Sequence, residues 1–134
     1  MGRRLLVIEP SLTIRTLLDI YLHRNGNQLT IFADYADALH ALVLPSIQAQ
    51  PPELVLIRLR PAQEESYRLI EYLRQQPCYV HTKIVGLIAQ EDEGHRQFQR
   101  LVREAQVVAL INPFRIQNLL ALVAEPGYMI PDVP

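Results

Sequence analysis

The sequence predicts an α/β fold in which five parallel strands alternate with five helices in one domain. Short apolar runs recur five times along the chain, each followed by apolar residues at helical spacing. The central run, residues 54–57, is apolar at four consecutive positions, which is typical of a strand that helices cover on both faces. We therefore expect a doubly wound sheet, with any site at the carboxyl ends of its strands, beside Arg58.

The first strand is expected over residues 5–9, and the first helix directly after Ser11, whose hydroxyl can cap it. Gly26 follows this helix and supplies the left-handed backbone that often ends one. Residues 28–33 are less uniformly apolar than the other strands, which favours an edge strand. The apolar positions of the first helix lie on one face: Ile14, Leu17, Leu18, Tyr21 and Leu22.

The second helix is expected after Asp34, with an inner face formed by Ala38, Leu39, Leu42 and Val43. Prolines in residues 45–52 predict a connection to the central strand rather than another helix. A third helix is expected between Pro61 and about Gln76, because apolar residues again recur at helical spacing there.

Strands are expected over residues 83–88 and 107–111, and the last two helices over 91–105 and 114–124. The fourth helix would open with acidic residues, which the helix dipole favours, and its inner face would be Phe98, Leu101, Val102 and Ala105. The last ten residues contain three prolines. We therefore expect a domain over residues 1–124 and an extended tail over 125–134.

Composition narrows the classes of function. The chain has 134 residues, 49% of them apolar, and a net charge of −1 from 13 basic and 14 acidic residues. This balance gives no excess of basic residues of the kind that binds nucleic acid or an anionic membrane surface. No run of apolar residues approaches the ~20 that a membrane span needs. The single cysteine excludes an internal disulfide, so a reducing, cytoplasmic setting is expected.

Four segments occur in a fixed order: LLVIEPS before a helix that carries Arg15, PELVLIRLRP, KIVGLIA and NPF. Together they resemble the receiver domain of two-component response regulators, over about residues 3–123. The resemblance implies the flavodoxin-like fold with sheet order 2-1-3-4-5, which the alternation of strands and helices also allows. It further implies a cis peptide bond between Asn112 and Pro113.

The positions that carry chemistry in receivers differ in this chain. The family's phosphate-accepting aspartate aligns with Arg58, and a guanidinium cannot attack phosphorus. The acidic pair that holds Mg²⁺ in the family aligns with Glu9 and Pro10, which leaves one carboxylate beside an arginine. The resemblance thus implies a degenerate pseudo-receiver, for which we expect no catalytic residue, no metal and no cofactor.

Three further receiver positions are also changed. The hydroxyl residue at the end of the fourth strand becomes Ile88, and the aromatic residue that signals activation becomes Ala109. The lysine before Pro113 becomes Asn112, which carries no charge to neutralise a phosphoryl group. Because five positions are changed together, compensation at one of them would not restore the aspartyl-phosphate chemistry of receivers.

Arg58 has three alternative roles. It can form an ion pair with Glu9, because the two residues are expected at adjacent strand ends, and so lock the former acid pocket. It can extend over the pocket with its charged group in water. It can also bind an anion such as a phosphate ester, together with nearby backbone amides.

We expect a non-enzymatic signalling module of a two-component or phosphorelay pathway that acts by protein–protein interaction without phosphorylation. In the family, the surface of the fourth helix, fifth strand and fifth helix commonly forms dimers or contacts effectors. That surface would fit an acidic signalling protein or a second copy of the chain. The alternative function is a sensor of small anions at Arg58. The expected interaction face is basic and amide-rich: Arg96, Gln99, Arg100, Arg103, Arg115 and Asn118.

Overall fold

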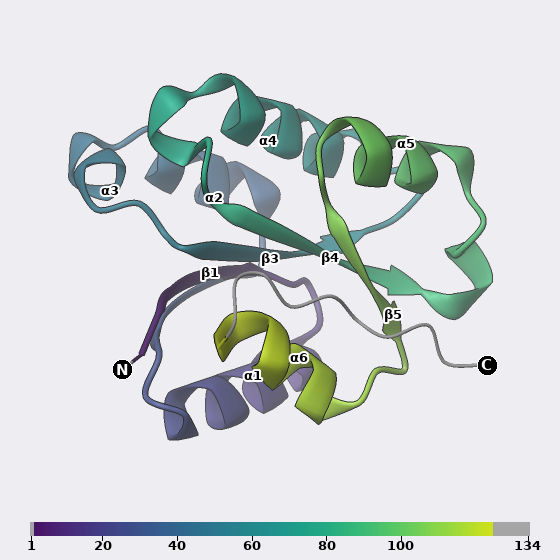
Figure 1. The fold of residues 1–134 in the computed structure, drawn as a ribbon, viewed down its shortest axis with the longest axis horizontal. Helices are drawn as coiled ribbons and strands as arrows, with labels where there is room; N and C mark the ends of the chain where they lie inside the picture. Colours follow the sequence, from purple (N-terminus) through teal and green to yellow (C-terminus); the bar gives the residue numbers. More distant parts are fainter. Residues whose placement is uncertain (1, 125–134) are drawn as a thin grey trace.

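The computed structural model of the chain describes residues 2–124 and contains a five-stranded sheet in which every neighbouring pair of strands is parallel (Figure 1). The order is β2-β1-β3-β4-β5, which confirms the predicted 2-1-3-4-5 topology and the edge position of β2. The tail predicted over residues 125–134 lies outside the described residues. The strands are β1 (Arg4–Ile8), β2 (Gln28–Phe32), β3 (Leu54–Leu59), β4 (Lys83–Ala89) and β5 (Val108–Asn112).

The described residues form six α-helices, one more than predicted, and two short 3₁₀ helices. Figure 1 shows α1 and α6 on one face of the sheet, and α2, α4 and α5 on the other. None of the helices in residues 2–124 has the length and apolarity to span a membrane. The helices are α1 (Leu12–Arg24), α2 (Tyr35–Leu42), α3 (Pro45–Ala49), α4 (Glu64–Gln75), α5 (Arg96–Glu104), α6 (Ile116–Ala124), η1 (Pro77–Tyr79) and η2 (Gln90–Asp92).

Two apolar layers hold the sheet between these helices. On one face Leu18 of α1 and Leu119 of α6 pack with Leu56 of β3, and on the other Ile70 of α4 packs with Ile57. Each fully buried aliphatic side chain contributes about 1.5–3 kcal/mol relative to an exposed one. All six residues of β3 are buried, including its one charged residue. The central strand thus carries Arg58 into the interior.

Two helix starts and one helix end follow the predicted local chemistry. Ser11 Oγ accepts a hydrogen bond from the Ile14 amide at 3.4 Å, and Asp34 Oδ1 accepts one from the Ala36 amide at 2.7 Å. Gly26 ends the α1 region with a φ of 80°. These caps fix where α1 and α2 begin, and hence where the loops after β1 and β2 lie.

Replacing Gly26 with alanine is expected to destabilise the fold by about 1–2 kcal/mol, because a Cβ disfavours left-handed backbone. A Cβ added at Gly26 or at Gly94 would meet no atom within 4 Å, and of these two glycines only Gly26 has a positive φ. Gly94→Ala is therefore the matched control and should leave stability nearly unchanged. Chemical denaturation of both variants checks the difference, and equal losses would contradict the backbone explanation.

Three predictions about elements were wrong. Residues 45–49 form the short helix α3 instead of a connection, with Pro45 in its first turn, where a missing N–H costs nothing. The helix predicted over 91–105 is split: Glu91 and Asp92 lie in η2, and α5 begins after His95, whose ring caps Gln97 N at 3.3 Å. The last helix begins at Ile116 instead of 114, after the loop that contains the cis Asn112–Pro113 bond.

Some predicted inner positions are exposed. The side chains of Leu17, Val43 and Val102 are 49%, 48% and 42% exposed, although each was expected on an inner face. In α2 the inner face is instead completed by Tyr35, which the apolar count did not include. The exposed Val102 belongs to a surface described below.

Candidate functional site

The site lies where β1 and β3 end side by side. The register of this parallel pair places Ile8 opposite Ile57. The next residue along each strand is therefore Glu9 on one side and Arg58 on the other. Since side chains alternate across a sheet, residues at the same register point to the same face. The register thus places the Glu9 carboxylate beside the Arg58 guanidinium at the carboxyl end of the sheet.

Glu9 and Arg58 form a buried, two-point ion pair. Arg58 Nε and Nη2 both donate to Glu9 Oε1, at 2.9 and 2.6 Å. The side chain of Glu9 is fully buried, and that of Arg58 is 7% exposed. This is the first of the three arrangements considered for Arg58. A guanidinium that lies with its charge in water is the arrangement that the structure contradicts.

Neighbouring groups hold the ion pair in place. The second carboxylate oxygen of Glu9 accepts a hydrogen bond from the Ser11 amide at 3.3 Å. Arg15 Nη1 donates to the carbonyl oxygens of Glu9 and Pro10, at 2.9 and 2.8 Å, and so fixes the loop between β1 and α1. Tyr35 Oη donates to the Arg58 carbonyl at 2.6 Å. Both carboxylate oxygens of Glu9 and the backbone carbonyls of both paired residues therefore accept hydrogen bonds from neighbouring groups.

Tyr35 is the residue of this site that sequence reasoning missed. It is 3% exposed at the start of α2, and burial raises the pKa of its phenol to about 12. That value includes the Glu9 charge, which also raises the pKa, and the guanidinium groups of Arg60 and Arg58, which lower it. A neutral phenol is thus held as a hydrogen-bond donor at ordinary pH. Only its position directly after the Asp34 cap could have indicated that it lies near the strand ends.

The residues at this site do not fit the Mg²⁺ ion that receivers hold. Both carboxylate oxygens of Glu9 already accept hydrogen bonds, and Pro10 offers no side-chain oxygen. The Arg58 guanidinium lies 2.6 Å from Glu9, where its charge would repel a cation. Within residues 2–124, no group of three or more His, Cys, Asp or Glu side chains is placed to hold a metal.

Of the other altered receiver positions, Ile88 and Asn112 lie at the carboxyl ends of β4 and β5, whereas Ala109 lies near the start of β5. Ile88 and Ala109 line one groove together with Pro113. Asn112 lines a second, smaller hollow of about 250 Å³ between the loop after β5 and Leu17 and Tyr21 of α1. Ile88 is 2% exposed, so it packs as a core residue where a receiver would offer a hydroxyl group to a phosphoryl group.

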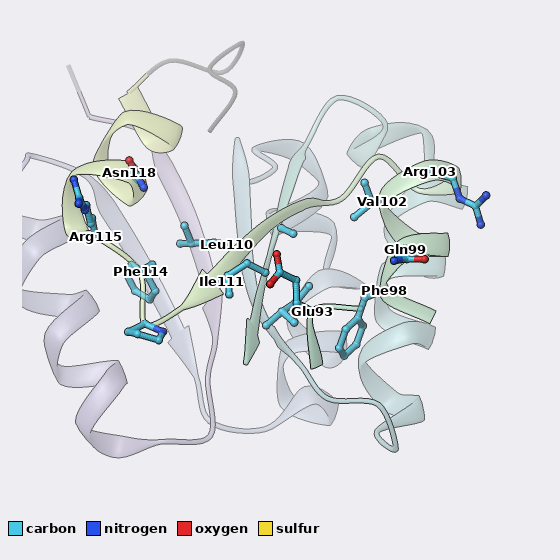
Figure 2. A pocket seen from close by; sticks show the side chains of 13 residues that line it. Glu93, Phe98, Gln99, Val102, Arg103, Leu110, Ile111, Phe114, Arg115 and Asn118 are labelled. Atoms are coloured by element: carbon cyan, nitrogen blue, oxygen red, sulfur yellow. The ribbon is translucent and has the colours of Figure 1, made fainter. Parts of the chain in front are cut away.

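The groove over β5 has a volume of about 1040 Å³. Figure 2 shows Leu110 and Ile111 of β5 between α5, which carries Val102, and α6. Among residues 2–124, the strand β5 is the edge of the sheet, and one of its sides has no neighbouring strand. Apolar and polar side chains both line the groove, a mixture found in many protein–protein interfaces.

Four of the six predicted interaction residues line this groove, and two lie beside it. Gln99, Arg103, Arg115 and Asn118 line it, and Glu93 adds one acidic group (Figure 2). Arg96 and Arg100 are exposed on the same helix as Arg103, and Arg100 pairs with Glu104 at 2.8 Å. We call these six residues the α5–β5–α6 face: Arg96, Gln99, Arg100, Arg103, Arg115 and Asn118.

The chain is similar to several solved structures. A protein from Chloroflexus aurantiacus assigned as a response regulator shares 25% identity at a TM-score of 0.71, with 92% of this chain and 95% of that chain covered. The chemotaxis response regulator CheY4 of Vibrio cholerae shares 19% at 0.72, with 92% and 98% covered. An adenylate cyclase from Rhodopirellula baltica shares 17% at 0.76, with 92% and 86% covered.

No protein-family model and no curated protein sequence matches the chain. The similarity therefore rests on structure, and it extends over nine-tenths of the chain with the strand order that the alternation of elements predicts. The chain has the flavodoxin-like fold of response-regulator receiver domains.

Proposed function

We propose that the chain is a receiver-like module of a two-component or phosphorelay pathway that acts by protein–protein contact and is not phosphorylated. The single observation that carries this proposal is the buried Glu9–Arg58 ion pair. It occupies the acid pocket with an internal cation and anion, at the place where receivers that signal by phosphate hold Mg²⁺ and an acceptor carboxylate. The proposal assigns the chain no enzymatic activity.

The remaining altered positions support the same function. Without a hydroxyl group at Ile88 and a lysine at Asn112, a phosphoryl group would have no partners at the ends of β4 and β5. Without an aromatic ring at Ala109, it would have no switch residue to move. The domain would then keep a single conformation, and it would act by binding to its partner.

The geometry weighs against the anion sensor. Arg58 uses Nε and Nη2 for Glu9, and the pair carries no net charge. An anion that took these two groups would have to displace a carboxylate that is fully buried, at a cost of several kcal/mol. The α5–β5–α6 face offers cationic groups that are already exposed, so an acidic protein or a second copy is the better partner.

The interaction face is tested with a charge placed in the groove. Val102→Glu is expected to weaken self-association, or association with a partner, by at least about tenfold, because the central apolar residues of an interface carry most of its energy. Val80→Glu, at an exposed position next to η1, is the matched control and should change nothing. Sedimentation velocity measures the effect. Equal effects of the two variants, or association only with acetyl phosphate and Mg²⁺, would contradict the proposal.

A further inference from the structure

The strand β2 is the edge of the sheet opposite to β5 in the described part of the chain. It reads QLTIF, so it has no charged residue and no proline, the two features that commonly keep an edge strand from pairing with another chain. Gln28 and Thr30 are exposed, and the three large apolar residues of the strand are only half-buried. The helices on the two faces therefore leave this strand open at its outer side.

The backbone of β2 offers hydrogen-bonding groups to that open side. The Gln28 amide and the Phe32 carbonyl each bond to β1, at 2.9 Å. Because the backbone groups of successive residues alternate in direction along a strand, those of Thr30 also face β1, and those of Leu29 and Ile31 point away from the sheet. Within residues 2–124, β2 pairs with β1 alone, and no loop bonds to the backbone of Leu29 or Ile31.

Two copies of β2 are complementary when they run antiparallel about a two-fold axis at Thr30. Leu29 of each copy then lies opposite Ile31 of the other, and the two residues of each such pair exchange N–H···O=C bonds in both directions. The two Thr30 side chains meet at the axis, and threonine pairs across strands are favourable. Since the strand has no charged residue, this pairing places no like charges opposite each other.

The charges at the two ends of β2 favour the same arrangement. His23 and Arg24, in the last turn of α1, precede the strand, and Asp34 and Asp37, at the start of α2, follow it. Antiparallel pairing brings the amino end of each β2 beside the carboxyl end of the other, so a basic end meets an acidic end twice. His23 pairs with Asp19 in its own helix, but Arg24 and Asp37 are exposed and form no ion pair among residues 2–124.

We propose that two copies of the chain associate through β2, so that their sheets join into one continuous sheet with the two-fold axis at Thr30. The partner at this edge is a second copy of the same chain. The α5–β5–α6 face lies at the opposite edge of the sheet and stays open to another protein. The contact through β2 thus goes beyond the proposed function and does not rest on it.

Sedimentation velocity over a range of protein concentrations tests the contact. We expect the wild type to form a dimer, and Thr30→Lys or Thr30→Glu to weaken it by at least about tenfold, because like charges would meet at the axis. An equal mixture of these two variants should form a heterodimer, since opposite charges then meet there. This rescue also shows that both variants are folded. Thr13→Lys, at an exposed threonine of α1, is the matched control and should dimerise like the wild type.

Amide hydrogen exchange followed by NMR locates the contact. In the wild type, the amides of Leu29 and Ile31 should exchange about tenfold more slowly when the protein is concentrated enough to dimerise, and this change should be absent in Thr30→Lys. The amides of Gln28 and Phe32 are predicted to show no such dependence, because they face β1.

Three results would overturn the contact through β2. They are a wild-type chain that stays monomeric at every concentration, a Thr30→Lys variant that dimerises like Thr13→Lys, and a mixture of the two Thr30 variants that does not associate. A dimer that Val102→Glu removes and Thr30→Lys leaves intact would also overturn it, and would assign self-association to the α5–β5–α6 face. None of these results contradicts the proposed function, which fails instead if the chain accepts a phosphoryl group.

Discussion

Glu9→Gln is expected to destabilise the protein by about 3–5 kcal/mol, because it leaves the Arg58 guanidinium buried without an opposite charge. For a domain of this size, such a loss lowers the melting midpoint by roughly 10 °C or more. Thermal and chemical denaturation at neutral pH measure the change. The loss would show that the pair is an integrated part of the fold and not a surface contact.

Two controls isolate the ion pair. Glu9→Gln combined with Arg58→Met should recover much of the loss, since a buried pair replaced on both sides by uncharged groups is often tolerated. Glu64→Gln breaks the exposed Glu64–Arg68 pair, with a distance of 3.5 Å, and should leave stability nearly unchanged. A Glu9→Gln variant as stable as the wild type would contradict the buried arrangement.

Raising the pH from 10 to 12 is expected to destabilise the protein through two buried tyrosines, Tyr35 and Tyr79. Burial raises the pKa of each phenol to about 12, and the charges of Glu9 and Cys78 add to the effect on Tyr35 and Tyr79 respectively. In the unfolded chain both titrate near 10. Their stabilisation is thus complete below pH 10 and is lost as the pH rises toward 12. At about 1.36 kcal/mol per pKa unit, each tyrosine contributes on the order of 3 kcal/mol at most.

Tyrosine-to-phenylalanine variants separate this effect from other alkaline titrations. Tyr35→Phe loses the hydrogen bond to the Arg58 carbonyl and should cost about 1 kcal/mol at neutral pH. Its stability should then fall less steeply than that of the wild type above pH 10. Denaturant unfolding at several pH values, with tyrosinate absorbance as a second readout, measures the slopes. Identical slopes in wild type, Tyr35→Phe and Tyr79→Phe would refute the assignment.

The sheet was predictable because its three central strands, β1, β3 and β4, are buried on both faces. Four consecutive apolar residues in β3 leave no polar face, and only a strand covered by helices on both sides accommodates them. Strand order then follows from the resemblance and from the alternation of elements. The contact of Glu9 with Arg58 was also predictable, because adjacent parallel strands end at the same edge.

The parts that could not be predicted depend on side-chain competition at helix ends. The break between η2 and α5 depends on the His95 ring accepting from the Gln97 amide, which no periodic pattern reveals. The burial of Tyr35 depends on its hydroxyl finding the Arg58 carbonyl from another element. Val102 fits a helical stripe, yet it is exposed and lines the groove over β5.

The most direct test of the central claim is the intact mass of the wild-type chain after incubation with acetyl phosphate and Mg²⁺. A receiver domain that has its acceptor aspartate serves as the positive control in the same reaction. We predict that the control gains a phosphoryl group, while this chain keeps its mass and its melting midpoint, because Arg58 occupies the acceptor position and pairs with Glu9. A phosphoryl group found on a carboxylate of this chain would contradict the account.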